Sequence, residues 1–236
     1  MDKKKLKNSL NIKRINNINL FITAFTHRSY LNESDQKNIE SNERLEFLGD
    51  AVLQFISTEF LYNKFKYLKE GVLTAYRSAL VNTQSLAEES KRLGFGEFLR
   101  LSKGEELNKG RDNTYILANT FEAVLGALYL DQGLKKTKEF LNQNLLYKID
   151  KIIKEKSYKD KKSMFQETVQ EREGITPNYK VLREWGPDHN KQFEVAVFIG
   201  KKQVAKGKGS SKQKAEINAA ENALKVYLKQ NKALKT

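Results

Sequence analysis

Three acidic side chains follow one another at helical spacing in the segment N-E-R-L-E-F-L-G-D-A-V-L, residues 42–53. Glu43, Glu46 and Asp50 stand at i, i+3 and i+7, which places all three on one face of a helix. Like charges on one face repel, so a compensating positive charge is expected, and Mg²⁺ prefers carboxylate oxygens as ligands. The spacing therefore favours a magnesium site, although a solvated helix face would show the same pattern.

A fourth carboxylate lies in a far more apolar segment, A-N-T-F-E-A-V-L-G-A-L-Y-L at 118–130. Glu122 is nearly alone there, and Asn119 lies one turn earlier on the same helix face. Because a buried carboxylate needs a partner, the cation implied by the first segment is expected to serve Glu122 as well.

The elements that must position these residues change in kind along the chain. Apolar residues at helical spacing predict helices near 19–30, 42–65, 71–91, 113–131 and 134–150. The later pattern predicts a helix at 163–173, strands at 179–185, 191–199 and 203–208, and a last helix capped by Ser210 or Ser211. We therefore expect a multidomain fold, with an all-α domain at 1–152, a linker at 153–161 and a small α+β domain (α-β-β-β-α) at 162–230.

Positive charge is concentrated in the second part of the chain. The 236 residues include 43 Lys and Arg against 29 Asp and Glu, a net charge of +14. Residues 1–150 carry 23 basic and 19 acidic side chains, a net +4, whereas residues 151–236 carry 20 and 10, a net +10. A basic excess confined to one segment is typical of proteins that bind polyanions, although a solubilising basic tail is the alternative.

Composition also excludes or disfavours several classes of protein. The absence of cysteine excludes disulfides, thiolate metal sites and a cysteine nucleophile. The longest apolar runs are far shorter than the roughly 20 residues that span a bilayer, and no hydrophobic stretch follows the basic N-terminus as in a secretory signal. We expect a cytoplasmic protein with no membrane partner and no nucleotide cofactor.

The segment at 42–53 resembles the most specific motif of the bacterial ribonuclease III family. The resemblance extends to F-T-H-R-S-Y at 25–30, L-R-L-S-K-G-E-E at 99–106 and A-N-T-F-E-A-V-L-G-A-L-Y-L-D at 118–131. The C-terminal α-β-β-β-α unit resembles a double-stranded-RNA-binding domain. The resemblance implies a homodimeric, Mg²⁺-dependent endoribonuclease of rRNA and mRNA processing, which cuts both strands of duplex RNA and leaves 5′-phosphate and 3′-hydroxyl ends.

Matched residue by residue, the resemblance assigns catalysis to Asp50 and Glu122, metal binding to Glu46, Asn119, Glu122 and Asp50, and a supporting role to Glu43. Glu122 is best placed to hold the water that attacks the phosphodiester.

Position 119 departs from the family pattern, which has Asp there. Because an amide oxygen can still coordinate a hard cation, we expect a site that needs more Mg²⁺. A degenerate site is the alternative, and it would leave a duplex-RNA-binding protein with weak or no cleavage.

Duplex RNA is bound across its minor groove and along the neighbouring phosphates. Three places in the C-terminal domain are expected to contact the duplex: the first helix, a turn between strands and the start of the last helix. The residues are Gln166, Glu167 and Gln170 on the first helix, His189 in the turn, and Lys212 and Lys214 on the last helix. A helix start suits phosphate because its amides are free, and Lys206 and Lys208 are expected to extend that patch. The alternative for these side chains is a solvated surface.

Two aromatic residues and one histidine have structural interpretations. Trp185 and Phe193 are expected in the core of the C-terminal domain, because stacking is not how duplex RNA is bound. His27, in T-H-R-S at a helix end, is expected to be a capping or core contact rather than a metal ligand.

Overall fold

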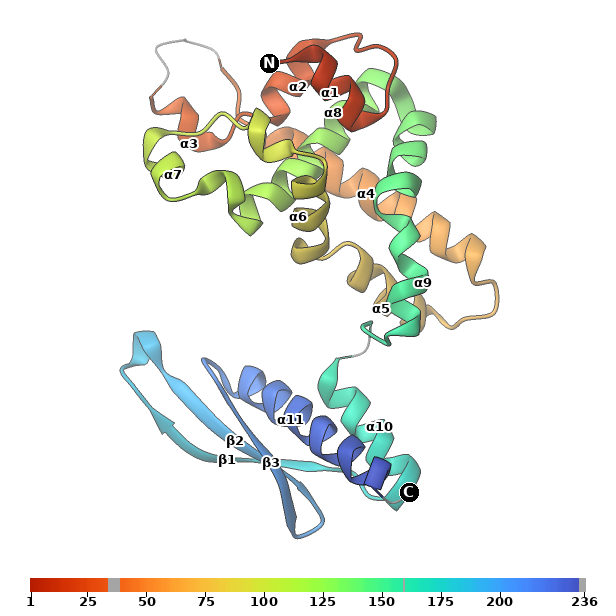
Figure 1. Ribbon diagram of the computed structural model, residues 1–236, viewed down its shortest axis with the longest axis vertical. Coiled ribbons are helices and arrows are strands. Elements are labelled where there is room, and N and C mark those ends of the chain that lie inside the picture. Colours follow the sequence, from red (N-terminus) through yellow and green to blue (C-terminus); the bar gives the residue numbers. More distant parts are fainter. Residues whose placement is uncertain (34–38, 159, 234–236) are drawn as a thin grey trace. The chain divides into compact units, whose positions relative to one another are not determined.

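The computed structural model describes residues 1–33, 39–158 and 160–233, and it divides into two units, Met1–Tyr158 and Lys159–Thr236 (Figure 1). The first unit is built from helices, and the second combines helices with a three-stranded antiparallel sheet. The prediction of an all-α unit followed by an α+β unit is confirmed.

The helical elements of the first unit, with 3-10 turns labelled η, are α1 (Lys3–Leu10), α2 (Ile18–Ala24), α3 (Arg28–Leu31), α4 (Glu43–Lys64), α5 (Glu70–Leu80), α6 (Thr83–Arg92), η1 (Phe95–Phe98), α7 (Lys103–Leu107), η2 (Gly110–Asp112), α8 (Thr114–Asn144), η3 (Leu146–Lys148) and α9 (Ile149–Lys154). None of the helices in the described part of the chain combines the length and the apolarity that a membrane crossing needs.

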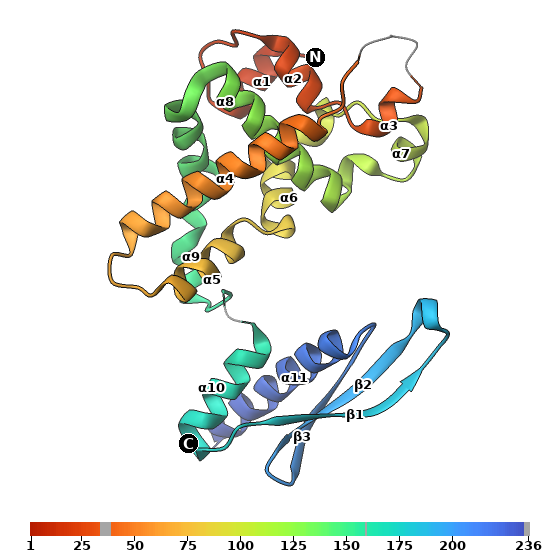
Figure 2. The same ribbon diagram turned by 180° about the vertical axis from the view of Figure 1, so that it is seen from behind.

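The core of the first unit surrounds the contact between α4 and α8, the two longest helices of that unit (Figure 2). Helix α4 buries one apolar face, whereas the central part of α8 is buried on nearly all sides. The buried side chains include Leu53, Ile56 and Leu61 from α4 and Phe121, Val124, Leu125 and Leu128 from α8. Burying these faces removes apolar surface from water, which is the main term that holds the helices together.

Backbone hydrogen bonds hold the start of α4 against the turn between α2 and α3. The Asn42 N–H donates to the Thr26 carbonyl at 2.8 Å, and the His27 N–H donates to the Arg100 carbonyl at 3.1 Å. These bonds divide the single helix predicted at 19–30, because its central backbone groups pair with neighbouring segments instead. They also fix the end of α4 that carries the first two acidic side chains.

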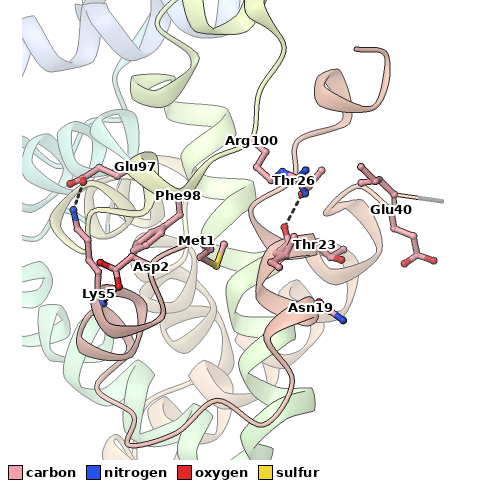
Figure 3. Close-up of a pocket in the computed structure, with 12 residues that line it drawn as sticks. Met1, Asp2, Lys5, Asn19, Thr23, Thr26, Glu40, Glu97, Phe98 and Arg100 are labelled. Carbon is pink, nitrogen blue, oxygen red and sulfur yellow. Dashed lines mark hydrogen bonds and ion pairs between the residues drawn. The ribbon is translucent and has the colours of Figure 1, made fainter. Parts of the chain in front are cut away.

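A cavity of about 1100 Å³ lies beside this turn, next to α1 (Figure 3). Lys5 of α1 is ion-paired with Glu97 of η1, while Thr26 and Arg100 line another part of the wall. No apolar period in the sequence predicts α1, since its eight residues are mostly polar and include only two leucines, both buried. None of the carboxylates singled out in the sequence lines this cavity.

Two other features of the first unit concern helix ends. Asn82 caps α6 by accepting a hydrogen bond from the Ser85 N–H at 2.9 Å, so the helix predicted at 71–91 is in fact α5 and α6. In α8, Gly133 has φ 78° and ψ 176°, a conformation that favours glycine. The predicted break between 131 and 134 falls at this residue.

The second unit has the predicted order α-β-β-β-α. Its elements are α10 (Lys161–Glu173), β1 (Asn178–Trp185), η4 (Asp188–Asn190), β2 (Gln192–Ile199), β3 (Lys202–Gly209) and α11 (Lys212–Ala233). The strands pair antiparallel in the order β1-β2-β3. Both helices cover the same face of the sheet (Figures 1 and 2), where Phe165 of α10 and Ala219 of α11 share a core with Val197 of β2.

Strand β3 and helix α11 approach at backbone distance. A β-carbon on Gly207 would lie 2.1 Å from the Ala219 nitrogen. Asn218 and Asn222 of α11 donate side-chain hydrogen bonds to the carbonyls of Lys208 and Lys206, at 2.7 and 2.8 Å. These contacts fix the N-terminal end of α11, which carries the lysines expected to contact RNA, against the sheet.

Candidate functional site

The candidate site lies where α4 crosses α8 at two glycines. A β-carbon on Gly49 would lie 1.7 Å from the Glu122 carbonyl oxygen, and one on Gly126 would lie 2.3 Å from a carbonyl oxygen of α4. Because neither glycine has a side chain, the two backbones touch. Glu46 and Asp50 stand on either side of Gly49 in the chain, so the crossing brings them beside Glu122.

The negative charges of Asp50 and Glu46 act on the Glu122 carboxyl. Burial, then the negative charge of Asp50, then that of Glu46 raise the pKa of the Glu122 carboxyl to about 7. Asp50 itself is exposed and accepts a hydrogen bond from the Gln54 amide at 3.2 Å. The site therefore concentrates negative charge around a half-buried acid.

Asn119 faces the same site. Burial and the neighbouring Glu43 raise the pKa of Glu46, and a hydrogen bond from the Asn119 side chain opposes that rise. Because such a bond lowers the pKa, the Asn119 amide donates to the ionised carboxylate. The structure thus brings together Glu46, Asp50, Asn119 and Glu122, the four residues that the resemblance implies as metal ligands.

Glu43 stands at the rim. Its carboxylate lies 3.8 Å from the Arg28 guanidinium and accepts a hydrogen bond from the Ser41 hydroxyl at 3.0 Å. Glu43, Glu46 and Asn119 line a cavity of about 810 Å³ together with residues of the α3 and α7 regions. His27 also lines it and accepts a hydrogen bond from the Ser29 N–H at 3.3 Å, so the prediction of a capping contact is confirmed.

Sequence reasoning missed several residues of this region. Gly49 and Gly126 had a detectable signal, since a glycine inside a helix is costly and suggests a close approach of another backbone. Glu105 and Tyr115 also line the 810 Å³ cavity, and Tyr115 is 73% exposed. Tyr115 had a spacing signal, because it stands at i, i+4 and i+7 with Asn119 and Glu122 on α8. Glu105 had none, because it reaches the cavity from α7.

The side chains at the crossing offer carboxylate oxygens and the amide oxygen of Asn119 as metal ligands. Hard divalent cations bind oxygen ligands of this kind. In the described part of the chain, no three Asp, Glu, His or Cys side chains form a group that could hold a metal ion as they stand. Repelling carboxylates are expected to lie apart unless a cation stands between them, and the fourth position here is an amide. The donor chemistry fits a magnesium ion, with one negative charge fewer than four carboxylates would provide.

The expected RNA-contacting residues of the second unit lie on α10, η4 and α11. Gln166, Glu167 and Gln170 are exposed on α10, and the Gln170 side chain accepts a hydrogen bond from the Thr176 hydroxyl at 2.9 Å. His189 is exposed in η4, between β1 and β2.

The two lysines at the start of α11 differ in their contacts. Lys212 forms an ion pair with Glu184 of β1 at 3.0 Å, and its ammonium lies 5.7 Å from the centre of the Phe193 ring. The Lys214 N–H donates to the Ser211 hydroxyl at 3.1 Å, so Ser211 is the capping serine. Part of the charge expected to meet phosphate at Lys212 is therefore balanced within the domain.

Two expectations about the second unit are wrong. Lys206 and Lys208 do not extend the patch at the start of α11. Gly207 and Gly209 face that helix, and because side chains alternate along a strand, the two lysines point to the other face of the sheet. Trp185 is 38% exposed rather than in the core, whereas Phe193 is buried as expected.

Family models match both units of the chain. The model described as Ribonuclease-III-like matches residues 17–149, and the model described as Double-stranded RNA binding motif matches residues 161–227. The first match alone spans more than half of the chain.

Curated relatives match most of the chain. Ribonuclease 3 of Streptococcus uberis is 48% identical over 207 residues, which cover 88% of this chain and 90% of the relative. Ribonuclease 3 of Borreliella afzelii is 45% identical over 211 residues, with 89% and 86% covered. A solved nuclease domain of ribonuclease III from Campylobacter jejuni, described as flexible in a region involved in dimer formation, has a TM-score of 0.55 and 39% identity. It covers 61% of this chain and 96% of that one.

Proposed function

This chain belongs to the ribonuclease III family of double-strand-specific endoribonucleases, and on that premise we propose that it hydrolyses duplex RNA with Mg²⁺ as its metal ion. The products carry 5′-phosphate and 3′-hydroxyl ends, and the substrates are rRNA and mRNA precursors in the cytoplasm. Catalysis belongs to residues 1–152 and duplex binding to residues 162–230, with 153–161 as the connection.

The observation that carries this proposal is the crossing of α4 and α8 at Gly49 and Gly126, which brings Glu46 and Asp50 beside Glu122. The pKa of Glu122, raised to about 7 by burial and by these two charges, agrees with it. An acid held in such surroundings is destabilised in its charged form unless a cation is near. Glu46, Asp50, Glu122 and the Asn119 amide oxygen are the proposed ligands, with Asp50 and Glu122 as the catalytic pair.

The chemistry follows from these positions. When bound, Mg²⁺ lowers the pKa of a water molecule and neutralises charge on the phosphoryl oxygens. The Glu122 carboxylate would hold the attacking water. The Asn119 hydrogen bond favours the charged form of Glu46 and so opposes the rise in the pKa of that carboxyl. Glu43 is held at the edge of the site by its contact with Arg28.

Gln166, Glu167 and Gln170 of α10, His189 of η4, and Lys212 and Lys214 of α11 are the proposed duplex contacts. The polar side chains meet the minor groove, while the lysines and the free amides of α11 meet phosphates. This division leaves the metal site of the first unit to do the cutting.

A homodimer is part of the proposal because α4 exposes a row of aromatic rings. Phe47, Phe55 and Tyr62 are 81%, 54% and 70% exposed, and their spacing places them on one face of α4. A cavity of about 680 Å³ beside Phe47 is lined by Leu48 of α4 and Leu130 of α8 among others. A protruding ring next to an apolar hollow suits a self-complementary two-fold interface.

A second candidate function is duplex binding with weak or no cleavage. It is favoured by Asn119 in place of a carboxylate and by the lack, among the described residues, of a ready group of three acidic or histidine ligands. In that case duplex binding by the basic second unit would be the main activity of the protein.

The deciding experiment incubates the full chain with a long RNA duplex under a titration of Mg²⁺ and, separately, of Ca²⁺. We expect binding with both ions and shortening only with Mg²⁺, with 5′-phosphate on the products. Glu122→Gln serves as the control that binds without cutting. Binding without shortening at any Mg²⁺ concentration would establish the second candidate instead.

A further inference from the structure

The face of the sheet opposite the helices has a composition that the duplex-binding residues do not explain. Helices α10 and α11 cover one face of the sheet, and the register of the strands identifies the other. Val195 and Val197 of β2 are fully buried toward the helices. Their neighbours Glu194, Ala196 and Phe198 therefore point to the helix-free face.

Residues paired with these three lie on the same face. Glu194 pairs with Arg183 of β1 and Lys208 of β3, and Ala196 pairs with Lys180 and Lys206. Phe198 and Gln192, also on β2, pair with Asn178 and Trp185 of β1. The helix-free face therefore carries Lys180, Arg183, Lys206 and Lys208 with a single carboxylate, that of Glu194.

Cations and aromatic rings are in contact on this face. The Arg183 guanidinium lies 4.9 Å from the centre of the Trp185 ring system, and the Lys208 ammonium lies 6.0 Å from it. Lys180 lies 5.5 Å from the centre of the Phe198 ring. Two cation–aromatic clusters thus stand side by side, one on each side of the small Ala196.

Glu194 does not neutralise the face. It lies 3.4 Å from Arg183 and 3.9 Å from Lys208, so one carboxylate is shared between two cations. Arg183 and Lys208 are 60% and 62% exposed at their side chains. Lys180 and Lys206 are exposed as well, which leaves a net charge that attracts a polyanion.

We propose that this helix-free face binds single-stranded RNA. Cations set beside exposed aromatic rings are how sequence-tolerant single-strand sites are built, because phosphates meet the cations and unstacked bases meet the rings. A duplex cannot use the rings, since its bases are already stacked and its readable groove displays edges and 2′-hydroxyls. The cations beside both rings disfavour an apolar protein surface. The rings favour RNA over an acidic protein surface, because bases can stack on them.

The site would give the domain two RNA surfaces on opposite sides. The duplex contacts proposed for α10 and the start of α11 lie on the helix side, and the one proposed for η4 lies in the turn between β1 and β2. The single-strand site lies on the helix-free face of the sheet. A duplex with an unpaired extension could then be held by both, which would favour substrates with single-stranded flanks over blunt ones.

Trp185 makes the test direct because it is the only tryptophan of the chain. Oligouridylate, which does not pair with itself, is titrated into the full chain in EDTA, so that nothing is cut. We expect the fluorescence of Trp185 to fall on binding, and the binding to weaken as salt is added. An unchanged tryptophan signal at concentrations that saturate binding would overturn the proposal.

Variants locate the site by fluorescence anisotropy of labelled oligouridylate. Lys180→Gln with Lys206→Gln should weaken binding by about tenfold and reduce the salt slope by about 1.4, at about 0.7 for each single-strand phosphate contact. Lys225→Gln, on α11 at 64% side-chain exposure, is the control for the loss of one lysine charge outside the sheet face and should leave the affinity within twofold. Equal losses in both would mean a non-specific charge effect and would refute the site.

A third variant separates this proposal from the duplex-binding function. Lys212→Ala with Lys214→Ala should weaken duplex binding and keep the affinity for oligouridylate. If oligouridylate binding falls together with duplex binding, single strands use the duplex surface and the sheet face is not a site. Duplex binding and cleavage are measured on the same samples, so a failure of either function is seen separately.

Discussion

Gly49 of α4 and Glu122 of α8 are in backbone contact, since a β-carbon on Gly49 would lie 1.7 Å from the Glu122 carbonyl oxygen. Gly49 lies in the chain between Glu46 and Asp50, two candidate ligands, and it contacts the backbone of Glu122, the third. The relative position of the two helix segments that carry the carboxylates is therefore set by contact between their main chains. A site held in this way keeps its geometry as long as the crossing stays tight.

Gly49→Ala tests that crossing. The added methyl group meets a carbonyl that cannot rotate away, so α4 and α8 must separate, at a cost of about 3 kcal/mol of unfolding free energy. We expect a lower urea midpoint and a large loss of cleavage rate at saturating Mg²⁺. Gly71→Ala in α5 is the control, because a β-carbon there meets nothing within 4 Å, and it should be neutral or stabilising by up to about 1 kcal/mol. Equal stability of the two variants would contradict the tight crossing.

The acidic face of α4 and the order of elements in the second unit were predictable because both are local. The spacing of Glu43, Glu46 and Asp50 fixes a shared helix face whatever the helix packs against. Alternation in 191–199 likewise predicts a strand that is buried on one side. The apolar surroundings of Glu122 also indicated a shared site, since an isolated carboxylate in such a helix has few other partners.

The features that the sequence did not predict depend on contacts between segments that are far apart in the chain. The break in the helix predicted at 19–30 arises from bonds to Asn42 and Arg100, which no local pattern contains. The direction of Lys206 and Lys208 follows from the register of β3, and a shift of one residue would turn both toward α11. The tight approach of Gly49 to α8 depends on where two helices cross, and spacing within either helix does not specify that.

Glu122→Gln is expected to change how stability depends on pH. The pKa of Glu122 in the fold, about 7, lies above its ordinary value, so the stability contributed by its protonated form is lost as pH rises toward and through 7. In EDTA the wild type should lose about 1–2 kcal/mol between pH 5 and pH 8, after allowance for solvent screening. The glutamine variant should lose much less, and should bind duplex RNA without cutting it.

Urea unfolding at several pH values measures this difference. Glu88→Gln, an exposed acid of α6, serves as the control and should keep the wild-type dependence. A wild-type profile in the Glu122 variant would show that another group is responsible.

Asn119→Asp should lower the Mg²⁺ concentration needed for half-maximal cleavage. The change adds a fourth carboxylate to the proposed ligands, and affinity for a hard divalent cation rises with the charge of its ligands. It also removes the hydrogen bond that Asn119 donates to Glu46, so the metal-free variant should be less stable near neutral pH.

The measurement is a Mg²⁺ titration of the initial cleavage rate, with Asn108→Asp as a control that makes the same charge change at an exposed position outside the site. We expect a shift of severalfold for Asn119→Asp alone. If its titration matches that of the wild type, the amide is not what sets the magnesium requirement.

Phe47→Ala should weaken the proposed homodimer. The ring is 81% exposed on α4, and a central aromatic anchor of an interface is worth about 2 kcal/mol or more when truncated. Sedimentation at a series of protein concentrations should show a dissociation constant raised by about 30-fold or more. Tyr67→Ala removes a ring that is 97% exposed outside α4, and it should leave the association state unchanged. A monomeric wild type, or equal weakening in both variants, would rule out this surface.

Glu184→Gln should strengthen duplex binding, because Glu184 competes with phosphate for the lysines around it. Its carboxylate lies 3.0 Å from Lys212 and 3.4 Å from Lys191, and the hydrogen bond from Lys212 is the first cause of its lowered pKa. Without that charge Lys212 is free to neutralise a phosphate, so the affinity should rise and the salt slope should steepen by up to about 0.9. Glu221→Gln changes a partly exposed acid that is paired with Lys225 on α11, and it removes the same charge elsewhere in the domain. Duplex affinity is measured in Ca²⁺ over a series of KCl concentrations. The gain is specific to the duplex surface only if the Glu184 variant exceeds this control both in affinity and in the salt slope.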